Sequence, residues 1–106
     1  IPIEGIIGLG GVAKKSPFVM QTMANVLNRP IQIARSEQTC ALGAAMFAAT
    51  AAGIHPSVSA AMDHMGSGFD AEYLPDPGQV PIYESLYQGY LAVGEQLEKI
   101  QKKTAE

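Results

Sequence analysis

The chain has 106 residues, seven of them basic and ten acidic, and a formal net charge of −3. This length allows one compact domain, or part of a larger one, and excludes two. The weak negative charge argues against nucleic acid or an anionic membrane as a partner. Apolar residues, many of them alanine, make up 47% of the chain and predict a folded protein with a soft core.

The single cysteine, Cys40, cannot form an internal disulfide and lies in an apolar stretch, so we expect a buried thiol and a reducing, cytoplasmic location. No signal-peptide pattern precedes the first strand-like run. The chain begins at Ile1 rather than at Met, which we interpret as a segment of a longer polypeptide. The longest uncharged window, residues 38–62, is too short in apolar residues and too rich in alanine for a membrane span, and predicts a buried helix.

Isoleucines and glycines over residues 3–9 predict a buried strand that ends in a tight turn at Gly10 and Gly11. Ser16 followed by Pro17 is a helix-start signal, because the hydroxyl can accept a free backbone N–H and proline fits the first helical position. A helix is therefore expected from Pro17 to about Leu27. Its apolar stripe comprises Met20, Met23, Ala24 and Leu27.

The run Asn28-Arg29-Pro30 ends that helix, since asparagine tolerates the left-handed conformation and proline extends the residue before it. Alternation over residues 31–34 predicts a second strand. A second helix, about 38–52, follows the acidic Glu37. It is apolar or small on nearly every face, which is typical of a helix enclosed by neighbours, and a close backbone approach is expected at its Gly43.

The last third is expected to hold a short helix, a loop and a long helix. Ser57 caps the short helix, which ends near Met65. Residues 66–80 are rich in Gly, Pro and Asp and predict a loop without regular structure. The long helix begins at Pro81, ends near Gln101 and lies in a C-terminal segment, 81–106. Its apolar stripe comprises Tyr83, Leu86, Tyr90, Val93, Leu97 and Ile100.

These elements predict an α/β fold with few strands and helices packed on them. Two strands make at best a marginal sheet, so further strands are expected elsewhere in the protein. We divide the chain into a strand-helix-strand-helix part (1–65), the loop (66–80) and the C-terminal helix (81–106).

The glycine turn is the most informative candidate for a site. Glycines at Gly10 and Gly11 let a backbone approach a ligand closely, and free N–H groups there attract anions. The spacing matches neither a Walker loop nor the dinucleotide Gly-x-Gly-x-x-Gly pattern. Lys14 and Lys15 are expected to be solvated, which leaves backbone contacts as the predicted mode of binding.

Other groups of polar residues predict packing or surface roles. His55, His64 and Cys40 lack the spacing of a zinc site and of an oriented nucleophile. The set Tyr83, Tyr87 and Tyr90 has helical spacing and no basic surround, which favours core packing over base stacking. Asp63, Asp70 and Asp76 are expected in turns or at the surface.

Two motifs, in order, resemble the C-terminal domain of the FGGY-type carbohydrate kinases. They are the run Gly10-Gly11-Val12-Ala13 and, after Glu37, the alanine-rich run Ala41-Leu42-Gly43-Ala44-Ala45. Further runs are similar to the ribulokinase branch: Val26-Leu27-Asn28-Arg29-Pro30 and Met46-Phe47-Ala48-Ala49. The resemblance implies a fragment of the ribonuclease H-like, actin-like ATPase fold.

The resemblance also implies an activity, namely ATP-dependent phosphorylation of ribulose in L-arabinose catabolism, with Mg²⁺ offsetting phosphate charge. It assigns ATP contacts to Gly10, Gly11, Val12, Ala13 and Ser16. Many relatives have glycine where Val12 stands, and some have asparagine where Ser16 stands. The catalytic base, the sugar site and the magnesium site belong to other parts of such proteins, so none is assigned here. We therefore expect the fragment alone to be inactive, and a homodimer is compatible with the resemblance.

Two alternatives remain. One is another FGGY kinase, such as a xylulokinase or glycerol kinase, because residues that select the sugar are not among these 106. The other is a non-enzymatic α/β binding module whose glycine turn is merely structural.

Overall fold

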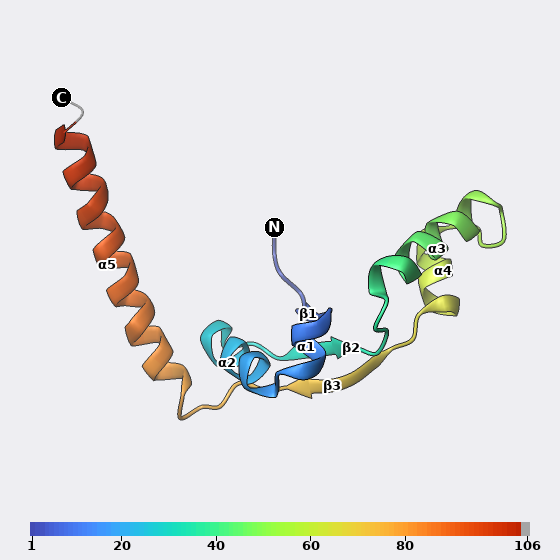
Figure 1. The fold of residues 1–106 in the computed structure, drawn as a ribbon, viewed down its shortest axis with the longest axis horizontal. Helices are drawn as coiled ribbons and strands as arrows, with labels where there is room; N and C mark the ends of the chain where they lie inside the picture. Colours follow the sequence, from blue (N-terminus) through green and yellow to red (C-terminus); the bar gives the residue numbers. More distant parts are fainter. Residues whose placement is uncertain (105–106) are drawn as a thin grey trace.

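The computed structural model describes residues 1–104, which form a short sheet with helices at both ends (Figure 1). The elements in chain order are β1 (Ile7–Gly8), α1 (Gly11–Lys15), α2 (Pro17–Leu27), β2 (Ile31–Ala34), α3 (Thr39–Ala51), α4 (Val58–Met65), β3 (Phe69–Tyr73) and α5 (Val80–Thr104). In Figure 1, α1 and α2 lie with the sheet, α3 and α4 lie together at one end, and α5 extends from the other.

The sheet has three strands in the order β1-β2-β3. β1 runs parallel to β2, and β3 pairs with β2 in the antiparallel direction. The prediction of a structureless loop at 66–80 is wrong, because β3 lies inside it. Phe69, Ala71 and Tyr73 alternate with two acidic residues, and Ala71 and Tyr73 pair with Ile33 and Ile31. That alternation is a strand signal, hidden among the turn residues that flank it.

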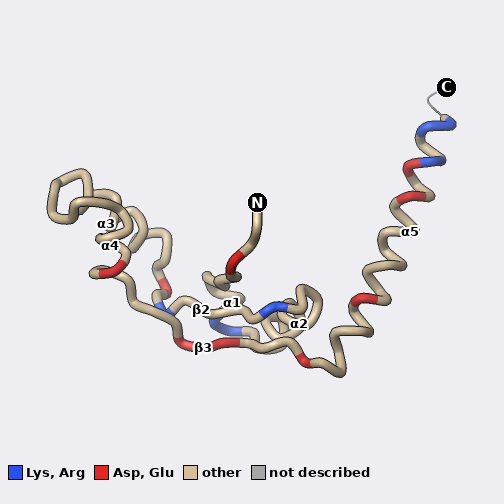
Figure 2. The backbone as a smooth tube through the Cα atoms, turned by 180° about the vertical axis from the view of Figure 1, so that it is seen from behind, with Lys and Arg blue, Asp and Glu red and all other residues tan. Residues whose placement is uncertain are grey.

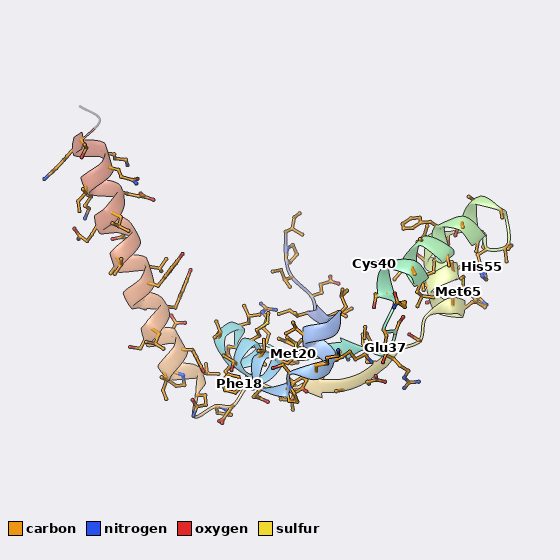
Figure 3. The ribbon with its side chains drawn as sticks, viewed as in Figure 1. Phe18, Met20, Glu37, Cys40, His55 and Met65 are labelled. Atoms are coloured by element: carbon orange, nitrogen blue, oxygen red, sulfur yellow. The ribbon has the colours of Figure 1, made fainter. Side chains whose placement is uncertain are left out.

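The core lies between α1, α2 and β2 and is small. Its buried members are Ala13, Met20, Ala24, Ile31 and Ile33. Met20 and Ala24 carry the apolar stripe predicted for α2, whereas Met23 and Leu27 are exposed. Figure 3 shows Met20 projecting from α2 in the central part of the molecule. A core of this size holds the glycine turn on β2 but does not reach the outer helices.

Local capping signals place the helix ends as the sequence predicts. The Ser16 hydroxyl accepts the Val19 N–H at 3.4 Å at the start of α2. Asn28 ends α2 in the left-handed conformation, with φ of 48°. The Ser57 hydroxyl accepts the Ala60 N–H at 3.2 Å at the start of α4. The structure thus confirms these three predictions. They could be made from the sequence because each depends on residues within four positions of one another.

Predictions of burial for the outer helices are wrong for this chain. Within residues 1–104, no residue of α3 or α5 is buried. Cys40 is exposed, an added Cβ at Gly43 would meet nothing within 4 Å, and the Tyr90 side chain of α5 is 74% exposed. The cause is that only α4 packs extensively along α3, and α5 meets the remainder mainly at α2.

The long helix α5 ends at Thr104, so the last two residues of the predicted segment 81–106 lie outside the described residues. Lysines gather toward its C-terminal end, where the helix dipole favours cations (Figure 2). None of the helices between residues 1 and 104 is both long enough and apolar enough to span a membrane.

Candidate functional site

The glycine turn connects β1 to α1. Gly10 precedes the first helical residue with φ of 89° and ψ of −179°, a backbone conformation that essentially only glycine adopts. The Lys14 N–H donates to the Gly10 carbonyl at 3.3 Å and opens the helix. The sequence predicts that the helix after this turn begins at Pro17, but α1 begins at Gly11. Ser16 ends α1 and also caps α2, so one serine serves two helices.

An open cleft of about 220 Å³ lies beside this turn, lined by Gly10, Gly11, Lys14, Lys15, Glu37 and Gln38. A second hollow of about 100 Å³ continues it toward Thr39 and Cys40, at the start of α3. Figure 3 shows Glu37 on the link that leads from β2 into α3, and Cys40 close by in the first turn of that helix. The turn after β1 and the start of α3 are therefore the two walls of one cleft.

Both walls present the beginning of a helix. The first amides of α1 and of α3 precede the first hydrogen bonds within their helices, which run from Lys14 N to Gly10 O and from Leu42 N to Gln38 O. The Gln38 side chain makes no capping bond to α3. Such amides carry partial positive charge, which favours anionic or electron-rich groups of a ligand. Lys15 adds a cation and Glu37 an anion, so the cleft suits a ligand with both anionic and hydrogen-donating parts.

The structure brings together only part of the predicted site. Gly10 and Gly11 line the cleft, and the Val12 side chain next to them is 60% exposed. Ala13 is only 5% exposed and belongs to the core. The Ser16 hydroxyl is engaged in capping α2. Ala13 and Ser16 therefore support the turn from the side of the core and of α2, and not from the side of the cleft.

Four lining residues lie outside the predicted site: Lys14, Lys15, Glu37 and Gln38. Glu37 and Gln38 are distant from the glycine turn in sequence and reach it only through the parallel pairing of β1 with β2. The available signal was the order strand, helix, strand, helix, because loops that follow adjacent parallel strands meet at one edge of a sheet.

The sequence predicts a solvated Lys14, but the structure shows its ammonium paired with protein groups. Its ammonium forms an ion pair with Asp70 of β3 and donates to the Arg35 carbonyl oxygen at 2.7 Å. Arg35 Nε donates to the other carboxylate oxygen of Asp70 at 3.0 Å. The hydrogen bond from Lys14, and after it that from Arg35, hold the pKa of Asp70 below its usual 3.8, so this carboxylate is ionised at neutral pH.

No three His, Cys, Asp or Glu side chains gather closely enough to hold a metal ion in the part of the chain that the structure describes. The His55 and His64 rings stack at 5.2 Å between centroids, and Asp76 accepts the Gly78 N–H at 2.8 Å in a turn.

A separate hollow, away from the glycine turn, measures about 260 Å³ and is lined in part by Glu4, Arg29 and Glu72. Arg29 donates to the Ile3 carbonyl oxygen at 3.0 Å, which engages the cation of this hollow. The two carboxylates disfavour a polyphosphate there. The cleft at the glycine turn is therefore the better candidate for an anionic ligand.

Comparison with known proteins identifies a family over the first half of the chain. Residues 1–52 match the FGGY family of carbohydrate kinases, C-terminal domain. The chain is 41% identical over 100 residues to a ribulokinase of Vibrio parahaemolyticus, which covers 94% of the chain and 18% of that relative. It is 43% identical over 94 residues to a ribulokinase of Bacillus licheniformis, which covers 85% of the chain and 17% of that relative. The chain thus spans less than one fifth of the length of these relatives.

Solved structures agree on the fold. A xylulose kinase from Lactobacillus acidophilus superposes with a TM-score of 0.76 at 30% identity, over 89% of this chain and 19% of its own. A gluconate kinase from the same organism superposes with a TM-score of 0.68 at 30% identity, over 78% of this chain and 16% of its own. Both kinases are much longer than this chain, and a part of each has a fold similar to it.

Proposed function

Because residues 1–52 belong to the C-terminal domain of the FGGY family of carbohydrate kinases, we propose that the chain is part of an ATP-dependent sugar kinase. Its cleft at the glycine turn forms one side of the ATP site. The observation that carries this proposal is the open cleft between Gly10–Gly11 and the start of α3, lined by the first residues of two helices.

The cleft supports a nucleotide through its backbone. Gly11 has no side chain to fill the space in front of it, since an added Cβ would meet nothing within 4 Å apart from its chain neighbours and the backbone of its own helix. A ligand can thus contact the main chain directly, with the amides of α1 directed to electron-rich atoms. Glu37 on the opposite wall accepts hydrogen bonds, which suits ribose hydroxyls or a purine amino group. Among the five residues of the predicted site, Gly10, Gly11 and Val12 would touch ATP, while Ala13 and Ser16 act by supporting the turn.

Ribulose is the proposed sugar. Relatives at 41% and 43% identity are ribulokinases, whereas the xylulose and gluconate kinases that superpose are 30% identical. The sugar and the general base would belong to the rest of the protein, as would any Mg²⁺, whose role in such kinases is to offset phosphate charge. We place the protein in the cytoplasm, where ATP is available, and its reaction in L-arabinose catabolism.

A steady-state assay on the whole protein that carries this segment tests the proposal. With ATP, ribulose is expected to give ADP release with a kcat/KM at least about tenfold higher than xylulose, gluconate or glycerol, because a sugar site discriminates by about that much for each well-placed hydrogen bond. Omission of the sugar is the control for background hydrolysis. A preference for xylulose would replace ribulose as substrate, and a folded protein with neither nucleotide binding nor turnover would favour the non-enzymatic module.

A further inference from the structure

The Asp70 carboxylate joins the two walls of the cleft. One of its oxygens pairs with the ammonium of Lys14, which belongs to α1 and lines the cleft. The other accepts Arg35 Nε at 3.0 Å, and Arg35 lies two residues before Glu37 on the opposite wall. The acidic residues of β3 and the basic residues of α1 and of the end of β2 lie close together in Figure 2. A single side chain from β3 thus connects both segments.

Further bonds fix this junction. Lys14 Nζ also donates to the Arg35 carbonyl oxygen at 2.7 Å, which ties the first wall directly to the backbone of the second. The Arg35 backbone N–H donates to the Gly68 carbonyl oxygen at 2.9 Å, and its guanidinium reaches the Phe69 carbonyl oxygen at 3.4 Å. The register of β2 with β3 shifts between Ile33 and Ala34, just before this point. The ladder of strand hydrogen bonds is interrupted here, so bonds from the backbone and the side chain of Arg35 complete the connection.

We propose that Asp70 is a positioning residue for ATP, which sets the separation of the glycine turn from the start of α3 through Lys14 and Arg35. This inference rests on the proposed function of the cleft. It also assigns Lys14 a supporting role, because its ammonium already has a carboxylate and a carbonyl oxygen as partners. Lys15 is then the cleft cation left to face a phosphate.

The effect should fall on binding more than on stability. The side chains of Asp70 and Arg35 are 41% and 62% exposed, and exposed ion pairs contribute little to the free energy of unfolding. A ligand held between two walls is more sensitive, since a small displacement of either wall weakens several contacts at once. Asp70→Asn removes the charge while keeping the shape, so it loosens the walls without opening a hole.

The test compares Asp70→Asn, Lys14→Met and the double variant in the whole protein, with Asp63→Asn on α4 as a matched control. Asp70→Asn is expected to raise the Kd and the KM for ATP by about threefold to tenfold, with the KM for ribulose and the thermal midpoint nearly unchanged. Asp70→Glu, which keeps the charge, should restore part of the affinity. The double variant should bind ATP no more weakly than Asp70→Asn alone, because both changes break the same junction.

Several outcomes would overturn the proposal. One is an unchanged Kd for ATP in Asp70→Asn. Another is a much larger loss in Lys14→Met than in Asp70→Asn, with additive losses in the double variant, since Lys14 would then bind the nucleotide itself. If Asp70→Asn does not fold, Arg35→Gln, which breaks only the second contact, must show the same selective rise in the Kd for ATP. ATP binding without sugar phosphorylation would sink the proposed kinase reaction and leave the Asp70 comparison decisive, whereas absence of ATP binding in the unchanged protein overturns both.

Discussion

Replacing Gly11 by alanine is expected to weaken ATP binding by about tenfold, equal to about 1.4 kcal/mol, without lowering the stability of the whole protein. Gly11 is the first residue of α1, and an added Cβ would meet nothing within 4 Å apart from its chain neighbours and the backbone of its own helix. Alanine is favoured over glycine in a helix by about 1 kcal/mol, so the fold tolerates the change or gains from it. The new methyl group would instead occupy the cleft where the nucleotide contacts the backbone. Isothermal titration with ATP, together with a thermal melt, measures both effects.

Gly10→Ala is the matched comparison. An added Cβ at Gly10 also meets nothing within 4 Å, but the backbone there has φ of 89°. This conformation costs a residue with a side chain on the order of 1–3 kcal/mol, so the variant should lose both stability and ATP affinity. The pair separates a conformational need for glycine from a need for space. Unchanged ATP affinity in a folded Gly11→Ala protein would show that the nucleotide does not lie against this turn.

The sequence predicts well those features that depend on near neighbours. The Ser16 and Ser57 caps, the left-handed Asn28 and the strand at residues 31–34 were all predicted from a few adjacent residues, and the structure confirms them. The helix α1 was missed because its five residues are too few to show a period, and Ser16-Pro17 is the stronger start signal. β3 was missed because turn residues flank its short alternating pattern, and because its partner, β2, is remote in sequence.

The candidate site also has a part that local sequence predicts and a part that depends on remote strand pairing. The turn at Gly10 and Gly11 is a local feature and was predicted, whereas Glu37 and Gln38 join it only when β1 and β2 pair. The junction of Lys14 with Asp70 depends on β3, so a reading that placed a loop at 66–80 could not find it. Ala13 has a structural role that the motif alone does not reveal. It belongs to the motif that implies ATP binding, yet burial in the core assigns its side chain to packing.

Burial was the least predictable property, because a periodic apolar stripe indicates that a face is covered but not which segment covers it. The stripe on α5 has the expected helical spacing, and yet Tyr83 is only half-buried and its other five residues are exposed across the described chain. The radius of gyration is 19.7 Å, compared with about 13 Å for a compact domain of this size. A xylulose kinase superposes on 89% of this chain in the same extended arrangement. The matched part is only 19% of that kinase. These faces therefore predict contacts with the rest of a longer polypeptide.

The isolated chain of 106 residues is accordingly expected to release no ADP above background with ribulose and ATP, and to protect its outer helices poorly. A helix without tertiary contacts is marginal in water, and Gly89 and Gly94 within α5 each cost about 1 kcal/mol relative to alanine. Amide hydrogen exchange should be fast throughout α5 and slower at Ile31 and Ile33 of β2, which are buried in the core. In the whole protein, the α5 amides should become strongly protected. Sugar-dependent turnover by the isolated chain, or cooperative unfolding that includes α5, would show instead that these residues form a complete functional unit.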